Sequence, residues 1–327
     1  MTASRQPFRI VRGDATALDA DALAGAVVAI GNFDGVHRGH RAVIGAALAR
    51  ARALGRKAAA LTFDPHPRSF FRPDLPVFRL TTERDKLRLL AATGLDGAVI
   101  LRFDARLAAT SAQDFIDRVL AGRLNIAGAA IGFDFHFGKD RQGSPAYLAG
   151  QGAAQGFAVD IVPPLQDEGR PVSSGAVRDA LTAGKVVEAA ELIGAPWFVS
   201  GEVVHGEKRG RDLGFPTANL RLDASCALKH GIYAVRVGLD GRLLDGVASF
   251  GRRPTFDNGA PLLEVFLFDF GGDLYGKTLD VAFIGWLRGE EKFASIDALQ
   301  RAMDNDAAQA KTVLARAPGA FPVLGAV

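Results

Sequence analysis

The stretch that decides the fold reads VVAIGNFDGVHRGHRAVIGAAL and spans residues 27–48. An apolar run at residues 27–30 gives way to a turn that contains Gly31, Gly35 and Gly39, and apolar residues then recur at helical spacing. This order predicts a β-strand, a tight loop and the first turns of an α-helix. A strand that passes through a short loop into a helix is the unit from which parallel α/β sheets are built.

The junction between this strand and this helix is expected to attract anions. Backbone N–H groups at a helix start lie at the positive end of the helix dipole, and glycines let a phosphate approach the backbone closely. His37 and His40 stand three residues apart on one helix face, where two imidazoles would hold a polyphosphate and stabilise developing charge. The alternative is a surface loop with two histidines by coincidence. It is disfavoured because the strand, Asn32, Asp34, the glycines and both histidines would all have to coincide.

The string GNFDGVHRGH, residues 31–40, resembles the HxGH signature of the nucleotidylyltransferase superfamily, in the variant found in prokaryotic bifunctional riboflavin kinase/FAD synthetases. The resemblance implies an α/β protein with an N-terminal Rossmann-like nucleotidylyltransferase domain on a parallel sheet. It also implies a C-terminal riboflavin kinase domain, a small antiparallel β-barrel with a terminal helix. The implied small molecules are riboflavin, FMN, ATP as substrate, and Mg²⁺. Within the string, the residues expected at the site are Gly31, Asn32, Phe33, Asp34, Gly35, His37 and His40.

Length and composition favour two domains without a nucleic-acid or membrane partner. A chain of 327 residues is about twice a typical domain. The net charge of +3 comes from 39 basic and 36 acidic residues, which is too balanced to indicate either partner. Cys226 is the only cysteine, no apolar run approaches the ~18 residues that span a bilayer, and no signal peptide is evident. We therefore expect a cytoplasmic protein, and the sequence does not predict its oligomeric state.

Strands alternate with helices in the first half of the chain, which predicts a parallel sheet with helices on both faces. The predicted strands cover residues 27–30, 58–63, 98–103, 129–132 and 158–162. Helices are predicted over residues 82–92 and from a cap at Ser111 to Leu120. Ligands of such folds bind beyond the carboxyl ends of the strands, where the glycine turn, the FDPHP segment at residues 63–67 and the loop after Gly132 would converge.

The loop IGFDFHFGKDRQG, residues 131–143, alternates Phe133, Phe135 and Phe137 with polar residues. The pattern is typical either of a strand extension that packs into the core or of a platform on which a planar heteroaromatic ring stacks. The loop is similar to the family's flavin-contacting loop, which implies flavin contacts from Asp134 and Phe137. The family places another aromatic residue near the flavin, which implies a contact from Phe63, the first residue of FDPHP. Asp134 stands where some members of the family carry Asn.

The segment PVSSGAVRDAL, residues 171–181, begins another predicted helix at Ser173 or Ser174. The two serines are either a structural cap or, with Arg178 one turn later, a second phosphate-binding helix start. The segment is similar to the family's ISSTxxR-type motif, with Gly175 in place of the usual Thr. The resemblance implies nucleotide contacts from both serines and a triphosphate contact from Arg178.

From Trp197 onward, short alternating strands replace the strand-helix units. We predict an FMN adenylyltransferase domain over residues 1–184, a linker over residues 185–196 and a riboflavin kinase domain over residues 197–327. Candidate strands at residues 198–204, 232–237, 243–250, 262–270 and 278–284, with a closing helix at residues 295–316, predict a small antiparallel barrel.

The stretch GEVVHGEKRGRDLGFPTANL, residues 201–220, combines glycines with cationic residues. It is either a plain flexible loop or a cover for nucleotide phosphates. In an extended chain Thr217 and Asn219 point to the same side, and two neutral oxygens there suit Mg²⁺, with ATP phosphates completing the coordination. The PTAN string at residues 216–219 resembles the riboflavin kinase signature. The residues expected to bind nucleotide in this stretch are Gly201, Gly206, Lys208, Arg211 and Gly214.

The strand LLEVFLFDF, residues 262–270, places Glu264 on the same face as Phe266, Phe268 and Phe270. If that face lies inside the barrel or at its mouth, burial would help Glu264 to accept a proton from a hydroxyl; the alternative is an edge glutamate in water. In the family a glutamate in this strand is the base for the riboflavin 5′-hydroxyl, which implies this role for Glu264. Many relatives carry His where this chain has Phe266.

These features together predict an enzyme with two sites. The barrel would phosphorylate riboflavin to FMN, and the α/β domain would join FMN to the α-phosphorus of a second ATP, which gives FAD and pyrophosphate. One rival is a single-activity nucleotidylyltransferase with a passive barrel, against which PTAN and Glu264 argue. The other is a flavin or nucleotide sensor without turnover, against which His37, His40 and Glu264 argue.

Overall fold

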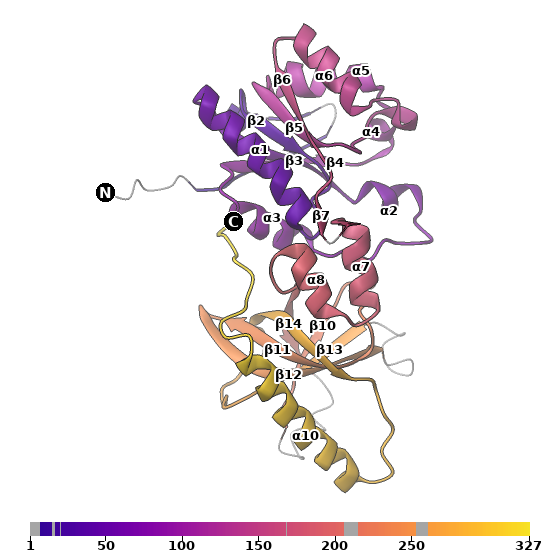
Figure 1. The fold of residues 1–327 in the computed structure, drawn as a ribbon, viewed down its shortest axis with the longest axis vertical. Coiled ribbons are helices and arrows are strands. Elements are labelled where there is room, and N and C mark those ends of the chain that lie inside the picture. Colours follow the sequence, from indigo (N-terminus) through magenta and orange to yellow (C-terminus); the bar gives the residue numbers. More distant parts are fainter. Residues whose placement is uncertain (1–6, 15–16, 20, 168, 206–214, 253–260) are drawn as a thin grey trace, which may run out of the picture. The chain divides into compact units, whose positions relative to one another are not determined.

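The chain divides into two compact units in the computed structural model (Figure 1). The described residues are 7–14, 17–19, 21–167, 169–205, 215–252 and 261–327. Unit 1 comprises Met1–Val77, Thr81–Ser173 and Val323–Val327. Unit 2 comprises Phe78–Leu80 and Ser174–Pro322.

Unit 1 is built on a six-stranded sheet in the order β1-β4-β3-β2-β5-β6, and all its pairings are parallel. Its strands are β1 (Arg9–Gly13), β2 (Val27–Ile30), β3 (Ala58–Asp64), β4 (Gly97–Arg102), β5 (Gly128–Gly132) and β6 (Ala158–Val162). Every residue of β2 is buried, as expected for a central strand that is covered on both faces. The predicted parallel sheet is confirmed, and β1 is an additional strand that the sequence patterns did not predict.

Helices connect these strands, and α1 packs against β2, β3, β5 and β6. The helices of unit 1 are η1 (Asp21–Leu23), α1 (Arg38–Leu54), α2 (Pro67–Phe71), α3 (Glu83–Ala91), α4 (Ala105–Ala109), α5 (Ala112–Asp114), η2 (Phe115–Arg123), η3 (Lys139–Arg141) and α6 (Pro145–Ala154). Ser111 caps α5 as predicted, but the helix continues as the π-helix η2. A two-stranded hairpin, β7 (Gln166–Asp167) and β8 (Arg170–Pro171), completes the unit.

Unit 2 contains a closed antiparallel barrel in the order β10-β13-β12-β11-β14-β9, which confirms the predicted barrel. Its strands are β9 (Phe198–Val204), β10 (Ala218–Arg221), β11 (Gly231–Leu239), β12 (Arg242–Arg252), β13 (Pro261–Leu267) and β14 (Thr278–Arg288). Strand β13 ends three residues before its predicted end at Phe270, because Asp269 has a φ of 54° and turns the chain. The unit also holds helices α7 (Ser174–Thr182), α8 (Val186–Ile193) and α10 (Ile296–Ala315).

Two arginines attach helix α10 to the barrel. Arg288 of β14 makes two hydrogen bonds to the buried Asp306, at 2.8 and 2.7 Å. Arg236 of β11 donates to Ala317 O at 2.5 Å, just beyond the carboxyl end of the helix. Cationic groups at a helix end pair with its free carbonyls and complement its dipole, so α10 is held at both its middle and its end.

Three residues that lie between α2 and α3 in sequence pack into unit 2. The Phe78 ring meets Trp197 edge to face at 5.8 Å, and Trp197 Nε1 donates to Leu80 O at 2.8 Å. Arg79 pairs with Asp223. The sequence patterns did not predict that residues 78–80 pack in unit 2, because nothing in a local window marks a loop that packs against residues more than a hundred positions away.

Candidate active sites

The glycine turn of unit 1 leads into α1, and His37 is the N-cap of that helix. The Nδ1 atom of His37 accepts a hydrogen bond from His40 N at 3.3 Å. A neutral His37 therefore carries its proton on Nε2, which remains a hydrogen-bond donor. The two imidazole rings stack at 3.6 Å with an interplanar angle of 22°, so the structure brings together the pair that the sequence placed on one face.

Left-handed backbone conformations shape this turn. Phe33, Gly35 and Val36 have φ values of 49°, 82° and 41°. The buried Asp34 accepts from Thr81 N at 3.0 Å and from Thr81 Oγ1 at 3.2 Å, and Gly35 N donates to the same hydroxyl at 3.3 Å. Asp34 therefore holds the turn against the segment before α3, and its contact with nucleotide stays a prediction. The sequence analysis missed Thr81, which lies too far along the chain for any local pattern to reveal.

Aromatic side chains gather at the carboxyl ends of β3 and β4. Phe63 is 9% exposed, and its ring lies 6.1 Å from that of Phe103 in an edge arrangement. Phe103 also contacts Phe70 and Phe71 of α2, of which Phe71 is 63% exposed. Sequence reasoning missed Phe70, Phe71 and Phe103 as candidate site residues, although the Phe-Phe pair that closely follows FDPHP is a signal that could have indicated this aromatic group. An exposed aromatic group at this edge suits a planar ligand.

The loop after β5 divides between core and surface. Phe137 belongs to the buried core of unit 1 and stacks on Phe135 at 5.4 Å, whereas Phe133 and Asp134 are exposed. The core interpretation is therefore correct for Phe137, and the predicted flavin contacts of Phe137 and Asp134 remain predictions.

In the predicted second phosphate-binding segment, helix α7 begins at Ser174. The boundary between the units falls at this point, so that Ser173 belongs to unit 1 and Ser174 to unit 2. The Nε atom of Arg178 donates to Phe78 O at 2.6 Å, within unit 2. This bond leaves the terminal nitrogens of the guanidinium to other partners. The phosphate contacts of Ser173, Ser174 and Arg178 remain predictions.

In unit 2, Asn219 and Glu264 are direct cross-strand partners in the antiparallel pair of β10 and β13. Ser249 of β12 faces Glu264 from the other side, and the sequence analysis did not single it out. Side chains of directly opposed residues lie on one face of a sheet with Cβ atoms about 5 Å apart. The predicted metal ligand, the predicted base and a hydroxyl therefore form one row across three strands.

The donor set around Asn219 fits a hard cation that also binds phosphate. Asn219 is 6% exposed, and its Nδ2 donates to Thr217 O at 3.4 Å, which leaves the amide oxygen as the ligand atom. No group of three or more His, Cys, Asp or Glu side chains able to hold a metal ion occurs in the described part of the chain. Neutral oxygens of Thr217 and Asn219, completed by phosphate oxygens, match the coordination that Mg²⁺ prefers at nucleotide sites.

Five residues of the stretch at residues 201–220 are predicted to bind nucleotide, and Gly201 is the one among them that the structure describes. It lies within β9 opposite Leu279 of β14. The other predicted contacts in this loop lie outside the described residues: Gly206, Lys208, Arg211 and Gly214.

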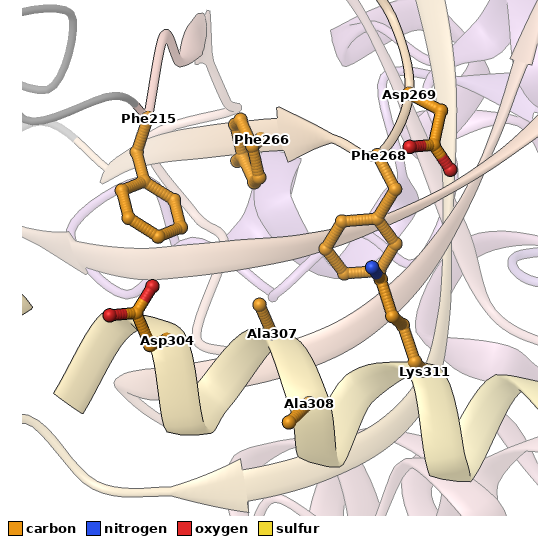
Figure 2. Close-up of a pocket in the computed structure, with 8 residues that line it drawn as sticks. All are labelled: Phe215, Phe266, Phe268, Asp269, Asp304, Ala307, Ala308 and Lys311. Atoms are coloured by element: carbon orange, nitrogen blue, oxygen red, sulfur yellow. The ribbon is translucent and has the colours of Figure 1, made fainter. Parts of the chain in front are cut away.

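A pocket of about 360 Å³ opens between β13 and helix α10 (Figure 2). Its lining residues are Phe215, Phe266, Phe268, Asp269, Asp304, Ala307, Ala308 and Lys311. The rings of Phe215 and Phe266 lie 4.8 Å apart, and Lys311 Nζ lies 5.0 Å from the centre of the Phe268 ring. The pocket thus offers aromatic faces on the barrel side and small or charged side chains on the helix side.

The alternation of β13 decides which face carries Glu264. Leu263, Val265 and Leu267 are buried in the closed barrel, whereas Glu264 and Phe266, which alternate with them, are only half-buried. Glu264 therefore does not lie in the barrel interior. It shares its outer face with Phe266 and Phe268, so the candidate base and the aromatic pocket lie along one strand face.

Comparison with known proteins assigns both units to described families. A family model for FAD synthetase matches residues 19–176, and one for riboflavin kinase matches residues 193–314. The bifunctional riboflavin kinase/FMN adenylyltransferase of Pseudomonas fluorescens is 42% identical over 292 residues, which cover 89% of this chain and 94% of that protein. This chain belongs to the bifunctional riboflavin kinase/FMN adenylyltransferase family. Family members from Escherichia coli K12 and Bacillus subtilis are 41% and 36% identical, over 86% and 88% of this chain and 90% and 92% of theirs.

A solved structure extends the similarity to the whole fold. A crystal structure described as a macrolide-efflux protein from Streptococcus pneumoniae superposes with a TM-score of 0.81 at 32% identity. The match covers 91% of this chain and 97% of that one. Among the described residues of this family member, no helix combines the length and apolar character needed to cross a bilayer.

Proposed function

We infer that this chain carries out two reactions in sequence: it phosphorylates riboflavin to FMN with ATP, and it adenylylates FMN with ATP to give FAD and pyrophosphate. The observation that carries this conclusion is that each of the two family models covers one constellation of candidate catalytic residues. The stacked His37–His40 pair falls in the first model, and the Asn219–Glu264 pair falls in the second.

In the kinase reaction, Glu264 is the proposed proton acceptor for the riboflavin 5′-hydroxyl. The rings of Phe215, Phe266 and Phe268 form a surface on which the isoalloxazine stacks, and Glu264 lies on the same strand face. A glutamate next to this surface takes the hydroxyl proton as the oxygen attacks the γ-phosphorus of ATP. Phosphoryl transfer requires mainly alignment and charge neutralisation, which a rigid barrel strand provides.

We propose that Thr217 and Asn219 hold a Mg²⁺ ion in this site. The bound ion would neutralise the ATP phosphates and orient them for transfer. Asn219 faces Glu264 directly across the strand pair, so the base and the phosphates would be held on the same barrel face. The five residues predicted to bind the nucleotide in residues 201–220 are proposed to do so here: Gly201, Gly206, Lys208, Arg211 and Gly214.

In the adenylylation, an oxygen of the FMN phosphate attacks the α-phosphorus of ATP, and the bond to pyrophosphate breaks. His37 donates from Nε2 to the phosphates, because its Nδ1 is engaged as the helix cap. The start of α1 and the imidazole of His40 add positive potential at the same place. Asn32 and Arg178 are proposed as further phosphate contacts, and Phe63 is proposed as a flavin contact. The proposed location of the enzyme is the cytoplasm.

Two parallel incubations test the proposal against its rivals. Purified protein is supplied with ATP, Mg²⁺ and either riboflavin or FMN, and the flavins are separated by chromatography. FMN and FAD are both expected from riboflavin, and FAD is expected from FMN. FAD formed only from added FMN would support a single-activity adenylyltransferase with a passive barrel, and bound but unchanged flavin would support a sensor.

A further inference from the structure

Lys86 is a buried lysine at the carboxyl edge of the parallel sheet in unit 1, and the reactions described above assign it no role. It lies on the buried side of α3, and only 7% of it is exposed. An ammonium group is costly to remove from water, so a buried lysine requires acceptors around it. The groups that accept from Lys86 therefore indicate what it stabilises.

The Nζ atom of Lys86 joins the ends of two neighbouring strands. It donates to Asn32 O at 3.4 Å, to Thr62 Oγ1 at 3.3 Å and to Phe63 O at 3.4 Å. The Thr62 hydroxyl donates in turn to Asn32 O at 3.1 Å. One side chain from α3 thus contacts the glycine turn that follows β2 and the end of β3, where Phe63 begins the aromatic group.

These contacts orient the peptide between Asn32 and Phe33, which is the entrance to the glycine turn. In a trans peptide the C=O and N–H groups point in opposite directions, so a carbonyl held by Lys86 directs the N–H of Phe33 away from Lys86. Phe33 has a φ of 49°, in the left-handed region that non-glycine residues rarely adopt. Such a conformation persists only where surrounding contacts hold it, and Lys86 and Thr62 supply contacts on this side of the turn.

We propose that Lys86 is a positioning residue for FMN adenylylation, which holds the Asn32–Phe33 peptide, and through it the start of α1, in the geometry that receives the triphosphate. The inference rests on the assignment of adenylylation to the glycine turn of unit 1.

The test compares Lys86→Met with Lys57→Met in the full-length protein. Lys57 is an exposed lysine of the same unit that donates to Ala22 O at 2.9 Å, so its replacement controls for the loss of a charge. In Lys86→Met, kcat for FAD synthesis from FMN is expected to fall by about 100-fold, the effect of small misplacements at reacting groups. KM for FMN and for ATP should stay within about threefold, since the ligand contacts remain. Riboflavin phosphorylation by the same preparation should stay within about twofold, because its residues lie in the other unit.

Several outcomes would overturn the proposal. One is that Lys86→Met makes FAD at a rate within about threefold of the unaltered protein. Another is that only KM rises while kcat for FAD synthesis is unchanged, and a third is that a folded variant loses both activities equally. If Lys86→Met does not fold, the variant Thr62→Val tests the proposal in its place. This variant removes the hydroxyl that donates to Asn32 O and should lower kcat for FAD synthesis by about tenfold; an unchanged kcat would contradict the proposal. Failure of the unaltered protein to make FAD would instead contradict the proposed function.

Discussion

Asn219 and Glu264 occupy directly opposed positions on β10 and β13, so the candidate metal ligand and the candidate base of the kinase site face the same side of the barrel. No sequence window contains both residues, since 45 positions separate them. The hydrogen-bonded register alone makes them neighbours, and it brings Ser249 to the other side of Glu264.

Replacing Glu264 by Gln removes the proton acceptor and preserves the shape of the side chain. Riboflavin phosphorylation is expected to fall by about 10²- to 10⁴-fold, the usual contribution of a general base. FAD production from supplied FMN should continue at the normal rate, because that reaction belongs to unit 1. Initial rates of both reactions measure the effect, with the exposed Glu202 of β9 changed to Gln as a matched control. Equal loss of both reactions would contradict independent sites.

Replacing Phe266 by Ala removes one aromatic wall of the pocket in unit 2. KM for riboflavin in the kinase reaction should rise by about tenfold, equivalent to about 1.4 kcal/mol of lost stacking and burial, while KM for ATP stays unchanged. Leu243→Ala, at a residue that is 49% exposed, provides the control. An unchanged KM for riboflavin would place the flavin elsewhere.

Replacing His37 separates its role as a helix cap from its role at the phosphates. Asn is a favourable N-cap residue, so His37→Asn should retain stability while FAD synthesis falls by about 10²- to 10³-fold. His37→Ala should lose a similar amount of activity and also about 1 kcal/mol of stability, because nothing then accepts from His40 N. Denaturant unfolding and FAD synthesis are measured together. Normal FAD synthesis by His37→Asn would remove His37 from the mechanism.

The ion pair between Asp223 and Arg79 should make the stability of unit 2 depend on pH. Burial raises the pKa of Asp223, but hydrogen bonds from Ser225 and Arg79 together outweigh it and hold the pKa below the ordinary value of 3.8. A carboxyl group with a lowered pKa in the folded state stabilises the protein above its unfolded pKa, and this contribution is lost as the pH falls through the folded pKa. Asp223→Asn should therefore cost about 1 kcal/mol at pH 7, a modest value because Arg79 is 37% exposed.

The measurement for this pair is urea unfolding of both proteins at a series of pH values. The difference in free energy of unfolding between the unaltered protein and Asp223→Asn should be constant near neutrality. It should shrink once the pH falls below about 4. A difference that stays the same at acid pH would show that the ionised form of Asp223 does not stabilise unit 2.

Local patterns predicted the elements well wherever the apolar period was regular. Strands β6 and β9 match their predicted bounds at residues 158–162 and 198–204, and α10 lies within the helix predicted at residues 295–316. The candidate residues of the glycine turn and of PTAN were also found from sequence, because each set lies within a few positions of a strand end or a helix start.

What the patterns missed depends on contacts between distant parts of the chain. Thr81 and Lys86 make hydrogen bonds to the candidate site residues Asp34 and Asn32, and Ser249 lies opposite Glu264. No local spacing marks these three residues. The sequence also left open whether Glu264 faces the barrel interior. Only closure of the barrel around Leu263 and Val265 assigned it to the outer face.

By itself, the order of residues determined the two kinds of architecture and the family, because periodicity and short motifs act over a few neighbouring positions. Tertiary structure alone decided the strand register that opposes Asn219 to Glu264 and the lysine that joins Asn32 to Phe63. The physical reason is that register and burial are set by packing of the whole unit, whereas the tendency to form a strand or a helix is set locally.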